Sequence, residues 1–236
     1  MCRPFLPPES RMNGIDHIVW INLDRSIERR QHMESLLASI HVPHTRISAV
    51  DGRKDIVVPT GRIPIPHLFQ KRIISRNDEA CSRSHIKAIK HLQNIQGRYF
   101  LVLEDDVLFD NLKLLPFDIA TVIRNCPPFD IIQISKTFQH ELTQQYTPYS
   151  GIYAGCQAYV IARSGVQKIV NLYPPGKSIR TRSEHTIFDP CKTYTYKYNL
   201  IDTLCSDSTL HPDNVIDHAR SKAIQRAIIL KDFPPV

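Results

Sequence analysis

Three consecutive carboxylates, Glu104, Asp105 and Asp106, directly follow an apolar run that begins at Tyr99. An unbroken apolar run of aromatic and branched residues is typical of a strand buried on both faces of a parallel sheet. In open α/β sheets, ligands bind just beyond the carboxyl ends of the strands. Adjacent acids repel one another unless a divalent cation lies between them, and Mg²⁺ or Mn²⁺ prefers such oxygen ligands. The motif therefore predicts either a divalent-metal site or an acidic turn with its charges in water.

The apolar stretch HIVWIN, residues 17–22, predicts a first buried strand. The polar turn LDRS, residues 23–26, follows it. Ser26 is placed to begin a helix that runs to about Ile40, with Arg29 in its first turn. A cation at a helix start opposes the macrodipole, and local inconsistencies of this kind tend to occur at functional sites. Arg25 or Arg29 could therefore bind a diphosphate through charge-assisted hydrogen bonds; the alternative is a surface arginine.

The rest of the chain alternates predicted strands and helices, which indicates one α/β domain with a mostly parallel sheet flanked by helices. We expect a short strand before the Asp51-Gly52 turn and a helix from Asn77 or Asp78 to about Gln96. The remaining expected elements are strands at 129–135 and 156–162, helices at 117–125, 164–172 and 217–230, and loops at 54–76 and 136–150.

The composition indicates which partners, cysteine chemistry and cellular location to expect. The chain has 236 residues and a net charge of +7, which fits an anionic partner or simply a solvated surface. Its six cysteines are far apart without a CxxC pair, no apolar run is long enough to span a bilayer, and the start lacks a signal-peptide pattern. We therefore expect reduced thiols, no transmembrane segment and a cytoplasmic location. Residues 1–14 are predicted to be a disordered leader.

Five segments together resemble glycosyltransferase family 25, which includes lipopolysaccharide and collagen galactosyltransferases. They occur in the family's order between about residues 18 and 170, and the resemblance weakens after Asn171. The segments are IVWINLDRSIERR (18–30), SAVDGR (48–53), EACSRSHIKAI (79–89), FLVLEDDV (100–107) and QAYVIARSGVQKIV (157–170).

The resemblance implies a GT-A-like domain over residues 15–236, with a nucleotide-binding half at about 15–110 and an acceptor half at about 111–236. The implied activity is metal-dependent, inverting transfer of a hexose, galactose or glucose, from a UDP-sugar to a hydroxyl of a glycan or glycosylated protein. The implied cofactor is Mn²⁺ or Mg²⁺, and the implied process is lipopolysaccharide or other glycan biosynthesis.

The donor-site residues follow from the matching motifs. Asp106, with Glu104 or Asp105, is expected to hold the cation that stabilises the leaving diphosphate, although the family's usual motif has Asp at the position of Glu104. Ser84 and His85 lie on the helix before this strand, and the alternative for His85 is a buried core histidine. The other candidates are Asn22, Leu23, Asp24, Arg25 and Arg29 at the nucleoside crevice, and Asp51 for a ribose hydroxyl or, alternatively, a local Asp-Gly turn.

Inverting transfer also requires a carboxylate base on the acceptor side. Glu184, expected in a polar loop, is the first candidate and Asp189 the second, and either could be an ordinary surface acid. His211 is a candidate further metal ligand, with a loop histidine as the alternative.

Two other classes of function are open. An inactive transferase fold could act as a glycan- or partner-binding module, which retention of all three acids disfavours. Nucleic-acid binding is ranked last, because the chain has no recognition-helix motif and no Lys/Arg-dense stripe. The expected partners are thus a nucleotide sugar and a glycan or protein-linked acceptor. The sequence does not determine the oligomeric state.

Overall fold

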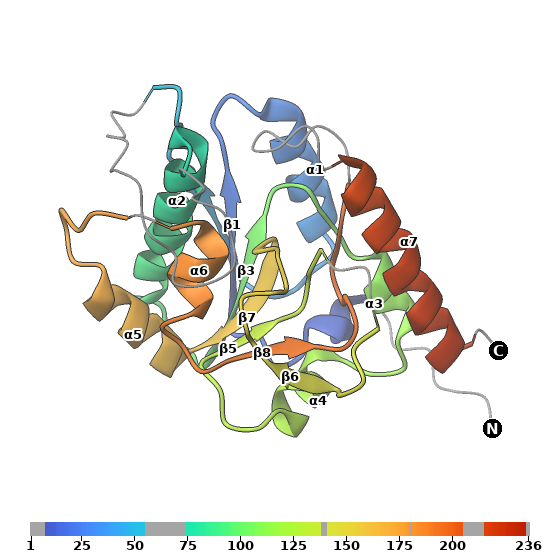
Figure 1. The fold of residues 1–236 in the computed structure, drawn as a ribbon. Helices are drawn as coiled ribbons and strands as arrows, with labels where there is room; N and C mark the ends of the chain where they lie inside the picture. Colours follow the sequence, from blue (N-terminus) through green and yellow to red (C-terminus); the bar gives the residue numbers. More distant parts are fainter. Residues whose placement is uncertain (1–7, 55–73, 138–140, 180, 205–214, 235–236) are drawn as a thin grey trace.

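The structure is a computed structural model that describes residues 8–54, 74–137, 141–179, 181–204 and 215–234 (Figure 1). Most of the predicted loop 54–76, and the candidate ligand His211, lie outside the described residues. No helix within the described ranges combines the length and apolarity that crossing a bilayer requires.

A seven-stranded sheet with the order β2-β1-β3-β7-β5-β8-β6 forms the centre of the molecule. Strands β1, β2, β3, β5 and β8 run in one direction, and β7 and β6 run against them. The α/β prediction is confirmed: the sheet is mixed but mostly parallel. The strands are β1 (His17–Asn22), β2 (His44–Ser48), β3 (Tyr99–Glu104), β5 (Ile131–Gln133), β6 (Tyr146–Pro148), β7 (Ala158–Ala162) and β8 (Thr193–Tyr196).

Helices cover both faces of this sheet (Figure 1). On β3, Phe100 and Val102 pack toward one layer, whereas Leu101 and Leu103 pack toward the other. This alternation is what a strand buried on both faces requires, and it explains the continuous apolar run. The first layer contains α2 (Arg76–Leu92), α5 (Arg163–Leu172) and α6 (Ser183–Phe188); the second contains α1 (Ile27–Leu37), α3 (Asp110–Leu114), α4 (Ile119–Asn125) and α7 (Val215–Asp232).

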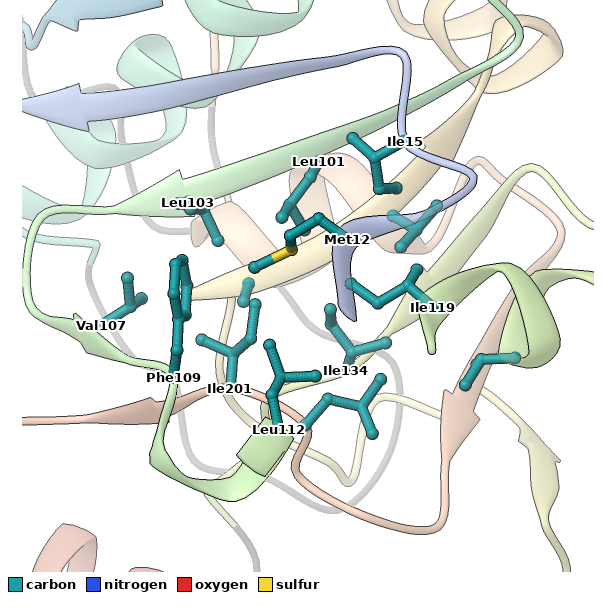
Figure 2. Packing of buried hydrophobic residues seen from close by; sticks show 14 of the residues in the cluster. Met12, Ile15, Leu101, Leu103, Val107, Phe109, Leu112, Ile119, Ile134 and Ile201 are labelled. Atoms are coloured by element: carbon teal, nitrogen blue, oxygen red, sulfur yellow. The ribbon is translucent and has the colours of Figure 1, made fainter. Parts of the chain in front are cut away.

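The second layer includes part of the predicted leader. Residues Pro8–Met12 form a 3₁₀-helix, η1, and Met12 is 1% exposed between Leu101 and Phe109 and their neighbours (Figure 2). The Arg11 guanidinium donates to the carbonyls of Leu115 and Phe117. The predicted leader of residues 1–14 is therefore too long, because an apolar side chain within it completes the core.

A small antiparallel pair, β4 (Val107–Leu108) with β9 (Asp202–Thr203), joins the two halves of the chain beside the acidic motif. The amide of Leu204 donates to the carbonyl oxygen of Asp106 at 2.7 Å. The backbone immediately after the carboxylates is thereby fixed to a segment almost a hundred residues later in the chain.

Several boundaries differ from the predictions. Helix α2 begins earlier than expected because Ser75 forms a capping box with Asp78. The predicted loop 136–150 contains the edge strand β6, which is short and partly exposed and so lacks an apolar pattern. The predicted strand at 156–162 is β7, which is antiparallel to both neighbours.

Candidate active site

The ends of three adjacent strands meet at one edge of the sheet. Ile21 on β1 is opposite Glu104 on β3, and Asn22 is opposite Ser48 on β2. Polar side chains that follow these strands are therefore at the same level, as the sequence analysis expected. The acidic motif follows β3 and so lies next to the end of β1, which pairs with both β2 and β3.

Asp105 holds this edge together. Asn22 Nδ2 donates to Asp105 Oδ2 at 2.6 Å, and Arg29 Nη1 donates to Asp105 Oδ1 at 3.0 Å. Asn22 also donates to the carbonyl of Ser26 and accepts from Arg46 Nε. Both carboxylate oxygens of Asp105 are thus engaged, and its role is to fix β1, α1 and β3 relative to one another.

The same contacts explain the arginine at the start of α1. Arg29 Nη1 lies 3.0 Å from Asp105 Oδ1 and 3.5 Å from Asp106 Oδ2. Its unfavourable position near the helix start is offset by two partly buried carboxylates, whose attraction is screened less than that of exposed charges.

Asp106 is the acid with unused binding capacity. Among the described residues, its Oδ1 atom is buried without a hydrogen-bond partner. Burial and the nearby charge of Glu104 raise its pKa to about 7, although Arg29 opposes this rise. A buried carboxylate oxygen that lacks a partner beside two further acids fits a bound cation.

A pocket opens between these strand ends and α2. Most of the predicted donor-site residues line it: Leu23, Arg25, Arg29, Asp51, Ser84, His85, Glu104 and Asp105. The remaining lining residues, which the sequence analysis did not select, are Ile21, Ala49, Val50, Gly52, Asn77, Ala80 and Cys81. Three predicted donor-site residues among the described ones do not line it. Asp106 follows the lining residues Glu104 and Asp105 in the chain. Asn22 is buried and donates to Asp105, and Asp24 binds Ser48 and Arg46, which lower its pKa.

Asp51 combines the two roles weighed for it. Its Oδ1 accepts from the amide of Arg53 at 2.9 Å, which is a local turn contact, and its Oδ2 lies 3.4 Å from Arg25 Nε. The neighbouring Gly52 lies close to α2, because a Cβ there would lie 2.7 Å from Asn77 Oδ1 and 3.1 Å from the carbonyl oxygen of Arg76. The turn is thus packed closely against the start of α2 and forms one wall of the pocket.

Ser84 and His85 fasten α2 to this pocket. Ser84 Oγ accepts from the amide of Val50 at 2.9 Å and donates to the carbonyl of Ala80 at 2.7 Å, so it supports the pocket wall. His85 is completely buried; its Nε2 lies 3.2 Å from Glu104 Oε1 and its Nδ1 lies 3.2 Å from the hydroxyl of Tyr159. His85 is therefore a core histidine with a polar neighbour at each ring nitrogen, and it also lines the pocket.

The two candidate bases differ in environment. Glu184 is in the first turn of α6, so the predicted loop is wrong: a six-residue helix with mixed polarity gives little periodic signal. Glu184 is not a lining residue, but its charge contributes, after burial and Glu104, to the raised pKa of the Cys81 thiol in the pocket wall. Asp189 ends the same helix, is 55% exposed and pairs with His185 at 3.3 Å, which raises the pKa of His185.

Comparisons with known proteins agree with this geometry. Residues 15–122 match the family model described as glycosyltransferase family 25 (LPS biosynthesis protein). The expected resemblance to glycosyltransferase family 25 is confirmed. A protein of Drosophila pseudoobscura pseudoobscura named glycosyltransferase 25 family member is 26% identical to this chain, over 84% of this chain and 34% of that protein. A Drosophila melanogaster protein of the same name is 27% identical, over 87% of this chain and 37% of that protein.

A human relative, procollagen galactosyltransferase 2, is 26% identical over 70% of this chain and 29% of its own length. The chain thus spans about a third of the length of the curated relatives that it matches. The family 25 match contains every described pocket residue but ends before Glu184 and Asp189. The pocket at the strand ends is therefore the part of the candidate site that the family match covers.

Proposed function

We propose that this chain is a glycosyltransferase domain that moves a hexose, galactose or glucose, from a UDP-sugar to a hydroxyl group. The observation that carries the proposal is the unpartnered Asp106 Oδ1, which directly follows the pocket-lining residues Glu104 and Asp105, in a chain similar to family 25 proteins. The name of the human relative supports galactose as the sugar and a protein-linked acceptor. The family description supports a glycan acceptor as the alternative.

Asp106 and Glu104 are the residues that would hold a divalent cation, Mn²⁺ or Mg²⁺. Such an ion would supply positive charge to the departing diphosphate. Asp105 is excluded from this role in our proposal, since Asn22 and Arg29 occupy both its oxygens. Arg29 holds the acids at a fixed spacing and offsets part of their mutual repulsion.

The nucleoside part of the donor is assigned to the pocket wall formed by the turn after β2. Asp51 is placed to accept from a ribose hydroxyl, and Arg25, 3.4 Å away, is placed to donate to a phosphate oxygen. The rigid contact of this turn with α2, through Ser84 and Gly52, keeps these groups in position before the donor binds.

Glu184 is the proposed base for inverting transfer. It lies in the first turn of α6, and its charge contributes to the raised pKa of Cys81, which lines the pocket. Asp189 is less suitable, because it is more than half exposed and already paired with His185. In the reaction, Glu184 would accept the proton of the acceptor hydroxyl as that hydroxyl attacks opposite the diphosphate.

Calorimetric titration with UDP, with and without Mn²⁺, tests the donor site. We expect Mn²⁺ to tighten UDP binding at least about tenfold, which is about 1.4 kcal/mol. Asp106→Asn should abolish the gain, whereas Asp110→Asn, an exposed acid on α3, should keep it. Equal UDP affinity with and without Mn²⁺ in the wild-type chain would refute the cation site.

Turnover separates the enzyme from a binding module. A panel of UDP- and GDP-sugars, assayed for release of the free nucleotide, should show Mn²⁺-dependent hydrolysis or transfer with a UDP-hexose. Tight UDP-sugar binding without turnover of any donor would favour the alternative, an inactive transferase fold that recognises glycans or protein partners.

A further inference from the structure

A second constellation of metal-ligating side chains lies in the wall of the pocket. Cys81, His85 and Glu104 each offer one ligand atom, and these atoms all lie within 4.8 Å of one another. Cys81 and His85 are four residues apart on α2 and so lie on the same face of the helix. Glu104 approaches them from the end of β3.

The orientation of His85 fits a metal ligand. Its Nε2 lies 3.2 Å from Glu104 Oε1, close to the roughly 3.4 Å that separates nitrogen and oxygen ligands in a tetrahedral zinc site. Its Nδ1 lies 3.2 Å from the Tyr159 hydroxyl, which can accept its proton and leave the Nε2 lone pair for an ion. Histidines that bind metals are usually oriented by such a second hydrogen bond.

The candidate site is open on one side. All three candidate ligands line the pocket, so an ion can enter from it and can keep one coordination position for water or an anion. Three protein ligands with one open position is the usual arrangement of a non-structural zinc site.

The chemistry of the ligands separates this group from the site at Asp106. Thiolate and imidazole are soft or borderline ligands that select Zn²⁺ and Cd²⁺, whereas carboxylates alone select Mg²⁺ or Mn²⁺. We propose that Cys81, His85 and Glu104 form a Zn²⁺ site in the wall of the donor pocket. On binding, a zinc–sulfur bond forms, the sulfur–hydrogen bond of the thiol breaks, and the proton passes to solvent. The inference does not rest on glycosyl transfer, because it concerns metal binding alone.

Cadmium serves as the probe, since a Cd²⁺–thiolate bond absorbs in the near ultraviolet. The full chain, reduced and freed of metal, is titrated with Cd²⁺ in the presence of excess Mg²⁺. We expect one tightly bound ion per chain with the thiolate absorption, and displacement of it by Zn²⁺. Cys81→Ser and His85→Gln should each lower the affinity by at least about tenfold, because losing even a hydrogen-bond partner of a metal ligand usually costs that much.

Matched controls make the result specific. Cys126→Ser and Cys191→Ser replace described free thiols that do not line the pocket, and both should keep the wild-type titration. Glu104→Gln tests the third ligand without touching α2, in case a substitution on the helix impairs folding; circular dichroism checks each variant. A thiolate signal that is absent in wild type, or that survives in Cys81→Ser, would overturn the proposal.

Asp106→Asn distinguishes this site from the proposed donor site. It should keep the cadmium signal while losing Mn²⁺-dependent UDP binding. If wild type binds Cd²⁺ through Cys81 but shows no Mn²⁺ effect on UDP, the proposed function fails and the zinc site stands.

Discussion

Replacing Asp106 by Asn should stabilise the metal-free protein at alkaline pH, although it removes a proposed ligand. The carboxylate of Asp106 is buried beside Glu104 and Asp105, and its pKa rises from the ordinary 3.8 to about 7. Asparagine has nearly the same shape without the charge. The substitution therefore removes an unfavourable charge and leaves the packing nearly intact.

The size of the expected gain in stability follows from the pKa of Asp106. A rise from 3.8 to about 7 corresponds to roughly 4 kcal/mol of destabilisation when the group is fully ionised. The Asp106 side chain is 19% exposed, so solvent screens part of this penalty, and we expect a gain of roughly 2 kcal/mol for Asp106→Asn at pH 8.

The pH dependence has a definite sign. Between the unfolded pKa near 3.8 and the folded pKa near 7, the folded state binds more protons than the unfolded state. Wild-type stability should therefore fall, through this group, as the pH rises across that window. The advantage of Asp106→Asn should be largest above pH 7 and mostly lost near pH 4.

Urea unfolding in EDTA at several pH values measures the difference in unfolding free energy between wild type and Asp106→Asn, with Asp110→Asn as the control. Asp110 is half exposed, and its hydrogen bond with Lys113 lowers its pKa, so its replacement should be neutral or slightly destabilising. Saturating Mn²⁺ should reverse the order of wild type and Asp106→Asn, because only wild type gains from the ion. An Asp106→Asn variant that is no more stable than wild type at pH 8 in EDTA would refute the reasoning.

Two further substitutions test other parts of the site. A double-mutant cycle of Arg29→Gln with Asp105→Asn should give a coupling free energy of about 1–3 kcal/mol in urea unfolding, since both side chains are mostly buried. The half-exposed Arg30–Glu34 pair is the control and should give less than about 0.5 kcal/mol. Equal couplings for the two pairs would contradict the assigned role of Arg29. Glu184→Gln should lower kcat by roughly 10²-fold with little change in UDP affinity; a near-normal kcat would remove Glu184 from the mechanism.

The meeting of polar residues at the ends of β1 and β3 was predictable because the sequence signals for it are local. The apolar runs of β1 and β3 end at polar residues, and parallel strands bring such ends to the same edge of a sheet. Even the misplaced charge of Arg29 pointed to this region, and its partner proved to be Asp105. What sequence reasoning missed is which oxygens are already occupied, since that depends on contacts between residues about eighty positions apart.

The role of Cys81 also could not be predicted from the sequence, because it depends on a residue that is distant in the chain. Its spacing of four residues before His85 placed it on the buried face of α2, where a thiol is ordinarily a small apolar residue. Only the approach of Glu104 from β3 turns this helical pair into a set of three ligands. The short elements were missed for a different reason: α6 and β6 have too few residues for a period to be visible.

The three consecutive acids at the end of β3 are distinguished by the groups that already neutralise them. Asp105 is paired with Arg29 and Asn22, Glu104 lies against His85, and Asp106 has one oxygen with no protein partner among the described residues. Glu104 is the last residue of β3, whereas Asp105 and Asp106 form the turn before β4, so the three neighbouring acids face different surroundings. A motif that reads as one cluster in the sequence therefore provides one structural acid and one acid open to a hard cation. The third, Glu104, has a carboxylate oxygen within 4.8 Å of ligand atoms of Cys81 and His85, so a soft ion bound there would draw on the same carboxylate as the cation that we propose at Asp106.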